Sequence, residues 1–203
     1  MRPLLILDCD EVVLDFVHPL RRWLRQAHDL ELRLDSYALA ANIRRLSDGS
    51  PIAAEEFPPL IDGFFRDAQA GQRPVPGVRE MLAELADVAD VHIVTNVPPA
   101  HGDARRTVLR DLGIAVPVHA NEGLKGPRIA ELAAGRPGVF VDDLPHQHKS
   151  VAEHAPQLKR LHFVATPELR AFMQPTRHAH ARIDDWPTAT RWIHQQIKEG
   201  PPA

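Results

Sequence analysis

The residues most able to do chemistry lie near the start of the chain, where Asp8 and Asp10 end the apolar run 4–7. A run that is apolar on both faces is typical of a central parallel strand with helices on either side. Ligands of open α/β sheets bind at the carboxyl ends of such strands, so we expect both carboxylates at a ligand site. Like charges held close together repel, and a fold keeps them when a cation or a reaction offsets that cost. A solvated loop after the strand is the competing interpretation.

A second pair of acids, Asp142 and Asp143, ends the apolar run 138–141 and repeats this arrangement. If both strands belong to one sheet, four acids gather at one edge. Carboxylate oxygens are ligands of hard divalent cations, so the set predicts Mg2+ as a cofactor. A redox metal would more often have histidine or cysteine ligands. His146 and His148 follow without an obvious third ligand nearby. They could touch substrate or the groups that support the acidic pair, but we expect a surface or capping role for them.

Two further strand ends carry groups that can bind anions. Thr95 and Asn96 follow the run 91–94, and a hydroxyl with successive backbone N–H groups before a helix can hold phosphate oxygens. An ordinary turn or helix cap is the alternative for this pair. Lys125 lies between an expected strand and an expected helix, where it could neutralise an anionic substrate and a carboxylate nucleophile. A solvated surface position is the commoner place for a lysine.

Hydrophobic periodicity indicates the elements that must position these groups. Apolar, β-rich runs recur at 3–7, 91–95, 116–118, 138–141 and 161–165. Helical spacing of apolar residues fills most of the segments between them, with helices expected near 78–85, 100–112 and 187–197. This alternation predicts an α/β fold with a Rossmann-like parallel sheet and helices on both faces.

The first two strands are separated by more chain than one crossover helix needs. We therefore expect an inserted helical module, residues 16–72, within a core formed by residues 1–15 and 73–203. Helices are expected in this module from Phe16 to Leu24, from Tyr37 to Leu46 and from Phe57 to Ala70.

The composition of the chain restricts the binding partners that we expect for the protein and its expected location in the cell. The 203 residues can bury one sizeable core, and the formal net charge of -3 gives no electrostatic case for nucleic acid. Cys9 is the only cysteine, which excludes an internal disulfide and fits a reducing compartment. No segment is apolar for long enough to span a membrane and no signal peptide is apparent, so we expect no membrane association and a cytoplasmic location. The sequence leaves the oligomeric state open.

The ordered motifs resemble those of the haloacid dehalogenase-like hydrolase superfamily. They are matched by Asp8-Cys9-Asp10, Thr95, Lys125 and Asp142-Asp143. The resemblance spans essentially the whole chain, and the segment 16–72 resembles the helical cap that the phosphatase branch inserts after the first strand. One departure is Glu11, where many members have glycine. Glu11 leaves the two aspartates intact, and the sequence leaves its effect on the turn after them open.

The resemblance implies that Asp8 attacks phosphorus and forms an aspartyl-phosphate, which divides one hard displacement into two easier ones. Asp10 would protonate the leaving alkoxide and later take a proton from the attacking water. The implied magnesium ligands are Asp8, the backbone carbonyl of Asp10, Asp142 and Asp143. Thr95 and the Asn96 N–H would hold the transferring group, and Lys125 would supply the remaining positive charge.

The resemblance also implies that the cap closes over the site and contacts the part of the substrate that does not react. Arg44 and Arg45, near the expected cap tip, are candidates for recognising a second anionic group, with an exposed helix face as the competing interpretation. No lysine occurs from 16 to 72, which argues against the phosphonate-cleaving branch, because that branch uses a cap lysine to form a Schiff base.

The resulting prediction is a magnesium-dependent phosphatase that acts on a small phosphorylated metabolite, a phosphate monoester. A sugar-phosphate mutase is the alternative on the same scaffold, because the same aspartates can return the phosphoryl group when water is kept away. A phosphoacceptor signalling domain and a non-catalytic binding protein are the alternatives from other classes. The order of the motifs and the long insertion argue against the signalling domain.

Overall fold

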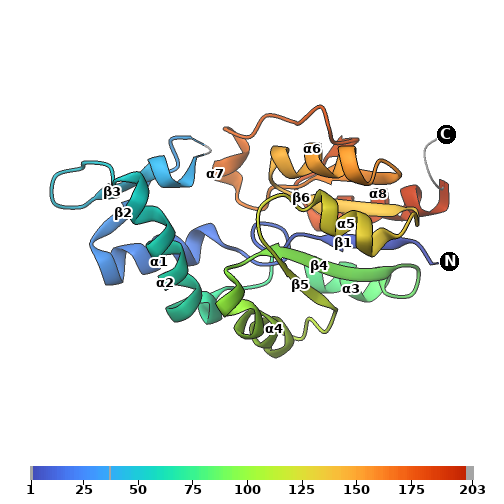
Figure 1. The fold of residues 1–203 in the computed structure, drawn as a ribbon, viewed down its shortest axis with the longest axis horizontal. Coiled ribbons are helices and arrows are strands. Elements are labelled where there is room, and N and C mark those ends of the chain that lie inside the picture. Colours follow the sequence, from blue (N-terminus) through green and yellow to red (C-terminus); the bar gives the residue numbers. More distant parts are fainter. Residues whose placement is uncertain (1, 37, 200–203) are drawn as a thin grey trace.

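A parallel six-stranded sheet forms the centre of the computed structural model, which describes residues 2–36 and 38–199 (Figure 1). The strands are β1 (Leu4–Leu7), β4 (Asp90–Asn96), β5 (Val118–Asn121), β6 (Gly138–Asp142), β7 (Leu158–His162) and β8 (Ala181–Arg182). They are ordered β5-β4-β1-β6-β7-β8, and every neighbouring pair is parallel. The α/β, Rossmann-like sheet predicted from the sequence is therefore confirmed.

The two central strands are apolar because they are covered on both faces. Every residue of β1 and β6 is buried, and Leu4 of β1 lies beside Gly138 of β6. A side chain on Gly138 would collide with the backbone of Leu4, so only glycine fits there. The order of the strands places β1 between β4 and β6, so the ends that carry Asp8, Thr95 and Asp142 are neighbours.

Helices pack on both faces of the sheet. The helices of the core are α3 (Val78–Leu85), α4 (Gly102–Asp111), α5 (Gly126–Ala133), α6 (Pro145–His154), α7 (Pro167–Arg170) and α8 (Trp186–Glu199), with a short 3-10 turn at Pro99–His101. One apolar cluster joins Leu5 and Leu7 to α3, α4 and α8, and another joins Leu4 and Ile6 to α5 and α6. Alternate residues of β1 thus enter opposite clusters, as expected of a strand.

The segment 16–72 contributes most of a third apolar cluster, and in Figure 1 its elements lie at one end of the molecule. Its elements are α1 (Val17–His28), β2 (Leu30–Leu32), β3 (Ile43–Arg45) and α2 (Phe57–Asp67), with 3-10 turns at Leu39–Asn42, Ala54–Glu56 and Gln69–Gly71. Helices at the first and third expected positions are confirmed, and the third ends earlier than Ala70.

The helix expected from Tyr37 to Leu46 is wrong. Tyr37 lies outside the described residues, and the rest of the segment is a 3-10 turn followed by β3, which pairs with β2 in antiparallel register. Leu32 and Ile43 face each other in this pair and are both buried, so packing between strands decides the local structure. The inserted module is therefore not purely helical.

Two strand boundaries differ from the expected ones. The run at 116–118 precedes most of β5, and the run at 161–165 continues past the end of β7 into buried loop residues such as Phe163 and Val164. Apolar residues beyond a strand end fill the core without extending the sheet, so their composition alone does not mark the boundary. Among the described residues, no helix combines the length and apolarity needed to cross a membrane.

Candidate active site

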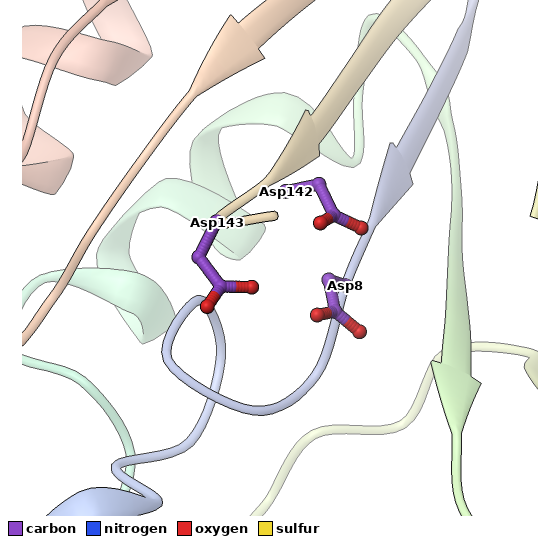
Figure 2. A group of neighbouring side chains, drawn as sticks. All are labelled: Asp8, Asp142 and Asp143. Carbon is purple, nitrogen blue, oxygen red and sulfur yellow. The ribbon is translucent and has the colours of Figure 1, made fainter. Parts of the chain in front are cut away.

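Three carboxylates converge where β1 and β6 end. Asp8 follows β1, Asp142 closes β6, and Asp143 is the next residue; Figure 2 shows their side chains directed into one space. One oxygen of each carboxylate lies within 4.8 Å of the others, and all three residues are buried. Burial, reinforced by repulsion from Asp142 and Asp8, raises the pKa of Asp143 well above its ordinary value.

The donor set of this cluster fits a hard divalent cation. Burial raises the pKa of Asp8 to about 6. The positive charge of Lys125 lowers this pKa but does not fully offset the effect of burial. Closely spaced, buried carboxylate oxygens that resist ionisation are groups whose charge a cation would stabilise. The three side chains therefore match the oxygen ligands expected of a magnesium site.

Lys125 bridges two of these acids. Its Nζ lies 2.6 Å from Oδ1 of Asp8 and 2.8 Å from Oδ2 of Asp142, and the side chain is 1% exposed. Burial alone would lower the pKa of Lys125, but Asp142 and Asp8 together hold it above its ordinary value. A solvated surface role for this lysine is thus excluded, and its ammonium group pairs with both carboxylates.

Asp10 is held apart from the three clustered carboxyl groups. Its Oδ1 accepts a hydrogen bond of 2.8 Å from Nε2 of Gln72, and Nη2 of the buried Arg105 lies 3.2 Å from the same oxygen. Burial raises the pKa of Asp10, while Arg105 and the Gln72 hydrogen bond oppose that rise. A carboxyl group that keeps its proton more readily than usual is suited to act as a general acid.

Gln72 and Arg105 were missed by reasoning from the sequence. Gln72 lies in the segment that returns from the insertion to the core, and Arg105 lies on α4, 95 residues from Asp10. Arg105 also donates to Sγ of Cys9 at 3.4 Å and lies over the ring of Phe65. Burial raises the pKa of the Cys9 thiol to about 12, so this side chain is not a thiolate at neutral pH.

Thr95 and Asn96 lie at the end of β4, beside the end of β1. The Oγ1 atom of Thr95 is buried, and within the described part of the chain it has no hydrogen-bond partner. A buried hydroxyl without a partner is costly, so Oγ1 of Thr95 would donate to a ligand oxygen that came within reach of it. The side chain of Asn96 is occupied, since it donates to the carbonyl of Gly123 at 2.8 Å and accepts from Asn121 at 2.8 Å.

The loop that carries Lys125 is anchored on α6. The backbone N–H of Lys125 donates to Oε1 of Gln147 at 2.8 Å, and that of Gly126 donates to Oγ of Ser150 at 3.1 Å. Nε2 of Gln147 donates in turn to the carbonyl of Gly123 at 3.0 Å. Because α6 begins directly after the acidic pair, one helix couples the position of the lysine to that of the carboxylates.

Two buried histidines hold the backbone of the acidic pair. Nε2 of His148 donates to the carbonyl of Asp142 and Nε2 of His162 to the carbonyl of Asp143, each at 2.9 Å. Burial lowers the pKa of both imidazoles to about 4, so both are neutral at neutral pH. The surface or capping role expected for His148 is therefore wrong, whereas His146 is exposed.

Glu11 keeps the backbone conformation that glycine favours, with a φ of 62°. Its Oε1 accepts hydrogen bonds from the N–H groups of Phe16 (3.1 Å) and Val17 (3.0 Å), and its Oε2 accepts one from Thr166 (3.0 Å). Burial raises the pKa of Glu11, and these three donors oppose the rise. The side chain thus ties the start of the inserted segment to a core loop.

A cavity of about 500 Å³ opens over the acidic cluster, between the core and the inserted segment. Asp8, Asp10, Asn96, Lys125 and Asp143 line its core side. Among the described residues, Arg44 and Arg45 are not part of its lining. Arg45 instead forms a 2.8 Å ion pair with Glu56, so the structure does not bring these two arginines to the site.

The comparisons with known proteins agree with this fold. Neither a protein-family model nor a curated protein matches the sequence. Solved structures do match, among them a proposed phosphoglycolate phosphatase of Lactobacillus delbrueckii subsp. bulgaricus, with a TM-score of 0.66 and 16% identity over 95% of this chain and 99% of that one. A haloacid dehalogenase-like protein of Agrobacterium tumefaciens has a TM-score of 0.65 and 17% identity, over 96% of this chain and 99% of that one.

A proposed β-phosphoglucomutase of Thermotoga maritima is also similar, with a TM-score of 0.60 and 15% identity over 97% of this chain and 99% of that one. The fold of the chain is thus that of the haloacid dehalogenase-like hydrolases. At these identities the likeness concerns the fold, and activity has to be argued from the site.

Proposed function

We propose that the chain is a magnesium-dependent phosphatase of the haloacid dehalogenase-like superfamily that hydrolyses a small phosphate monoester. The observation that carries the proposal is the contact between Asp8 and Lys125, 2.6 Å apart, beside two further buried carboxylates. A carboxylate paired with an ammonium group can approach an anionic phosphoryl group that would otherwise repel it. Solved structures with the same fold include a proposed phosphoglycolate phosphatase, which supports phosphoryl transfer as the reaction class.

In this proposal, Asp8 attacks phosphorus, and an Asp8 acyl-phosphate forms as the bond to the leaving oxygen breaks. Asp10 gives its proton to the leaving alkoxide, and its raised pKa supports that role. In the second half-reaction Asp10 takes a proton from water, which attacks the phosphorus and releases phosphate and Asp8. Gln72 and Arg105 keep Asp10 oriented through both steps.

The proposed magnesium ligands are the side chains of Asp8, Asp142 and Asp143, together with the backbone carbonyl of Asp10. When bound, the cation would neutralise charge on the phosphoryl oxygens. Thr95 donates its free hydroxyl to a phosphoryl oxygen, and the N–H of Asn96 binds a second one. Lys125 balances the charge that remains.

We also propose that residues 16–72 act as a cap over residues 1–15 and 73–203. The cavity supports this division, because its lining comes from both parts of the chain. A cap that covers the site would exclude bulk water and contact the part of the substrate that leaves.

The test is phosphate release from a panel of monoesters, with magnesium and with a chelator. We expect release that requires magnesium, is lost in Asp8→Asn and falls roughly 100- to 10,000-fold in Asp10→Asn. Asp87→Asn, which changes an exposed aspartate, is the matched control and should retain full activity. Undiminished release by Asp8→Asn would rule out the proposed nucleophile.

A mutase is the second candidate, favoured by the similarity to the proposed β-phosphoglucomutase. The same two aspartates could return the phosphoryl group to another hydroxyl of a sugar phosphate. Phosphorus NMR of the products separates the two functions. An isomerised sugar phosphate without free phosphate would replace the phosphatase proposal by the mutase.

A further inference from the structure

The two sides of the cavity differ in chemistry. The core side carries the carboxylates and Lys125 described above, whereas the side chains that the described residues of the inserted segment contribute to the lining are all apolar. The side chains larger than alanine that the inserted segment contributes are Phe16, Val17, Leu39, Phe57, Ile61 and Phe65. Leu144 and Leu169 of the core extend the same apolar surface. A molecule bound at Asp8 would therefore direct its non-reacting part against apolar side chains.

The described lining residues offer no free cation that could pair with a second anionic group on the substrate. Among the described lining residues, four are carboxylates (Asp8, Asp10, Glu11 and Asp143) and the one cation is Lys125. The ammonium group of Lys125 is already within 2.8 Å of two carboxylates. A carboxylate or a second phosphate on the substrate would meet apolar walls and negative charge, both of which oppose its binding.

Hydroxyl groups on the substrate would also lack side-chain partners among the described residues of the apolar side. A hydroxyl moved from water to a hydrocarbon surface loses its hydrogen bonds, and a site without donors or acceptors does not replace them. Apolar carbon, in contrast, gains from leaving water, and such pockets bind ligands mainly through hydrophobic and aromatic side chains. Both effects select against sugars and acids.

We propose that the phosphate monoester cleaved by this protein has an apolar leaving group, an alkyl or arylalkyl alcohol without a second anionic group. This inference rests on the proposed phosphatase function and names its substrate class. The phosphate would occupy the polar floor beside Asp8 and Lys125. The hydrocarbon part would pack against α2, where Phe57, Ile61 and Phe65 line the cavity.

The test compares esters of primary alcohols, so that the leaving oxygens have similar reactivity. The apolar probes are n-hexyl phosphate and 2-phenylethyl phosphate, and the polar probes are 2-phosphoglycolate, glycerol 1-phosphate and glucose 6-phosphate. We expect kcat/KM to be at least roughly tenfold higher for the apolar probes, mainly through a lower KM. Equal or faster cleavage of a polar probe would overturn this inference while leaving the phosphatase intact.

A substitution on the apolar wall gives a second readout. Ile61→Arg places a cation on a half-buried position of α2 without disfavouring the helix. We expect it to reduce kcat/KM for n-hexyl phosphate roughly tenfold or more and to raise it for 2-phosphoglycolate. Arg44→Ala, outside the lining, is the matched control and should leave both values unchanged. An unchanged preference in a folded Ile61→Arg protein would contradict the proposed wall.

Failure of the proposed function gives a different pattern. In that case none of the five esters releases phosphate, and acetyl phosphate does not label Asp8. Calorimetry then measures binding of n-hexyl phosphate and 2-phosphoglycolate to the parent protein with magnesium. Weaker or equal binding of the hexyl ester would overturn the apolar site as well, and tighter binding would retain it as a property of a non-catalytic protein.

Discussion

Glu11 shows how one side chain can replace the conformational freedom of glycine. The positive φ at this position costs an ordinary residue roughly 1 kcal/mol, whereas glycine adopts it freely. The carboxylate offsets that cost by accepting three backbone hydrogen bonds, two at the start of α1 and one at Thr166. Glu11 therefore holds a left-handed backbone conformation in this turn, and its side chain supplies hydrogen bonds that glycine could not make.

Replacing this carboxylate should loosen the start of the inserted segment. We predict that Glu11→Gln lowers the free energy of unfolding by roughly 1–3 kcal/mol, because an amide N–H2 group then faces a backbone donor in a buried site. Urea unfolding measures this loss, with Glu55→Gln on the surface as the control. A loss below roughly 0.5 kcal/mol, the usual range of surface substitutions, would show that the three hydrogen bonds contribute little.

The pair of helices α5 and α6 controls where the Lys125 ammonium group lies. Gly126, the first residue of α5, approaches α6 so closely that a methyl group would overlap the carbonyl and hydroxyl oxygens of Ser150. Backbone atoms of α6 cannot yield as a flexible side chain would. The contact therefore requires glycine next to the lysine.

We predict that Gly126→Ala separates α5 from α6 and moves Lys125 away from Asp8. The overlap should cost roughly 1–3 kcal/mol of stability, and the displaced ammonium group should lower kcat. Urea unfolding and phosphate release measure the two effects. Gly102→Ala is the matched control, because its methyl group would lie at an ordinary 3.5 Å from Ala120. Equal behaviour of the two variants would exclude a special role for the close approach.

For the molecule as a whole, the buried neutral histidines make stability depend on pH. The pKa of His148 and of His162 is about 4 in the folded protein, below the ordinary value of 6.5. Below pH 6.5 these two histidines bind protons in the unfolded chain. In the folded protein they remain neutral until the pH falls to about 4. Protonation thus favours unfolding in this window, and the stability contributed by the neutral histidines is lost as the pH falls.

We predict that His148→Gln and His162→Gln each lose less stability between pH 7 and pH 5 than the parent protein does. Glutamine can still donate to the carbonyl of Asp142 or Asp143 but does not titrate. Urea unfolding at both pH values gives the difference, and His146→Gln, exposed on the same helix, should follow the parent. A parallel loss in all four proteins would mean that these imidazoles do not control the acid sensitivity.

The inserted segment and the core also make apolar contacts between residues that are far apart in the sequence. The cluster of the inserted segment contains Val97, Val164, Leu169 and Met173 of the core. Asp62 on α2 accepts a 2.8 Å hydrogen bond from His101 beside α4, and the ring of Phe65 stacks on that of His101. The inserted segment thus contacts the core through residues far apart in sequence.

The sequence by itself determined the parallel sheet and the strand ends that carry Asp8, Thr95 and Asp142. These features are local, since an apolar run and the residue that ends it are adjacent in the chain. Because parallel strands end at one edge, their order along the chain was enough to predict a common site. Lys125 was a candidate from its place between a strand and a helix, but only the family resemblance favoured it over a surface position, as one lysine carries no periodic signal.

Only the tertiary structure decided which groups support those residues. Gln72 and Arg105 reach Asp10 from 62 and 95 residues away, and such long-range partners leave no local pattern. The pairing of β2 with β3 overrode the helix expected there, because cross-strand packing outweighs local propensity. Arg44 and Arg45 lie on β3, outside the cavity lining, and the apolar side of the cavity is formed by residues separated along the chain, such as Phe16 and Phe65.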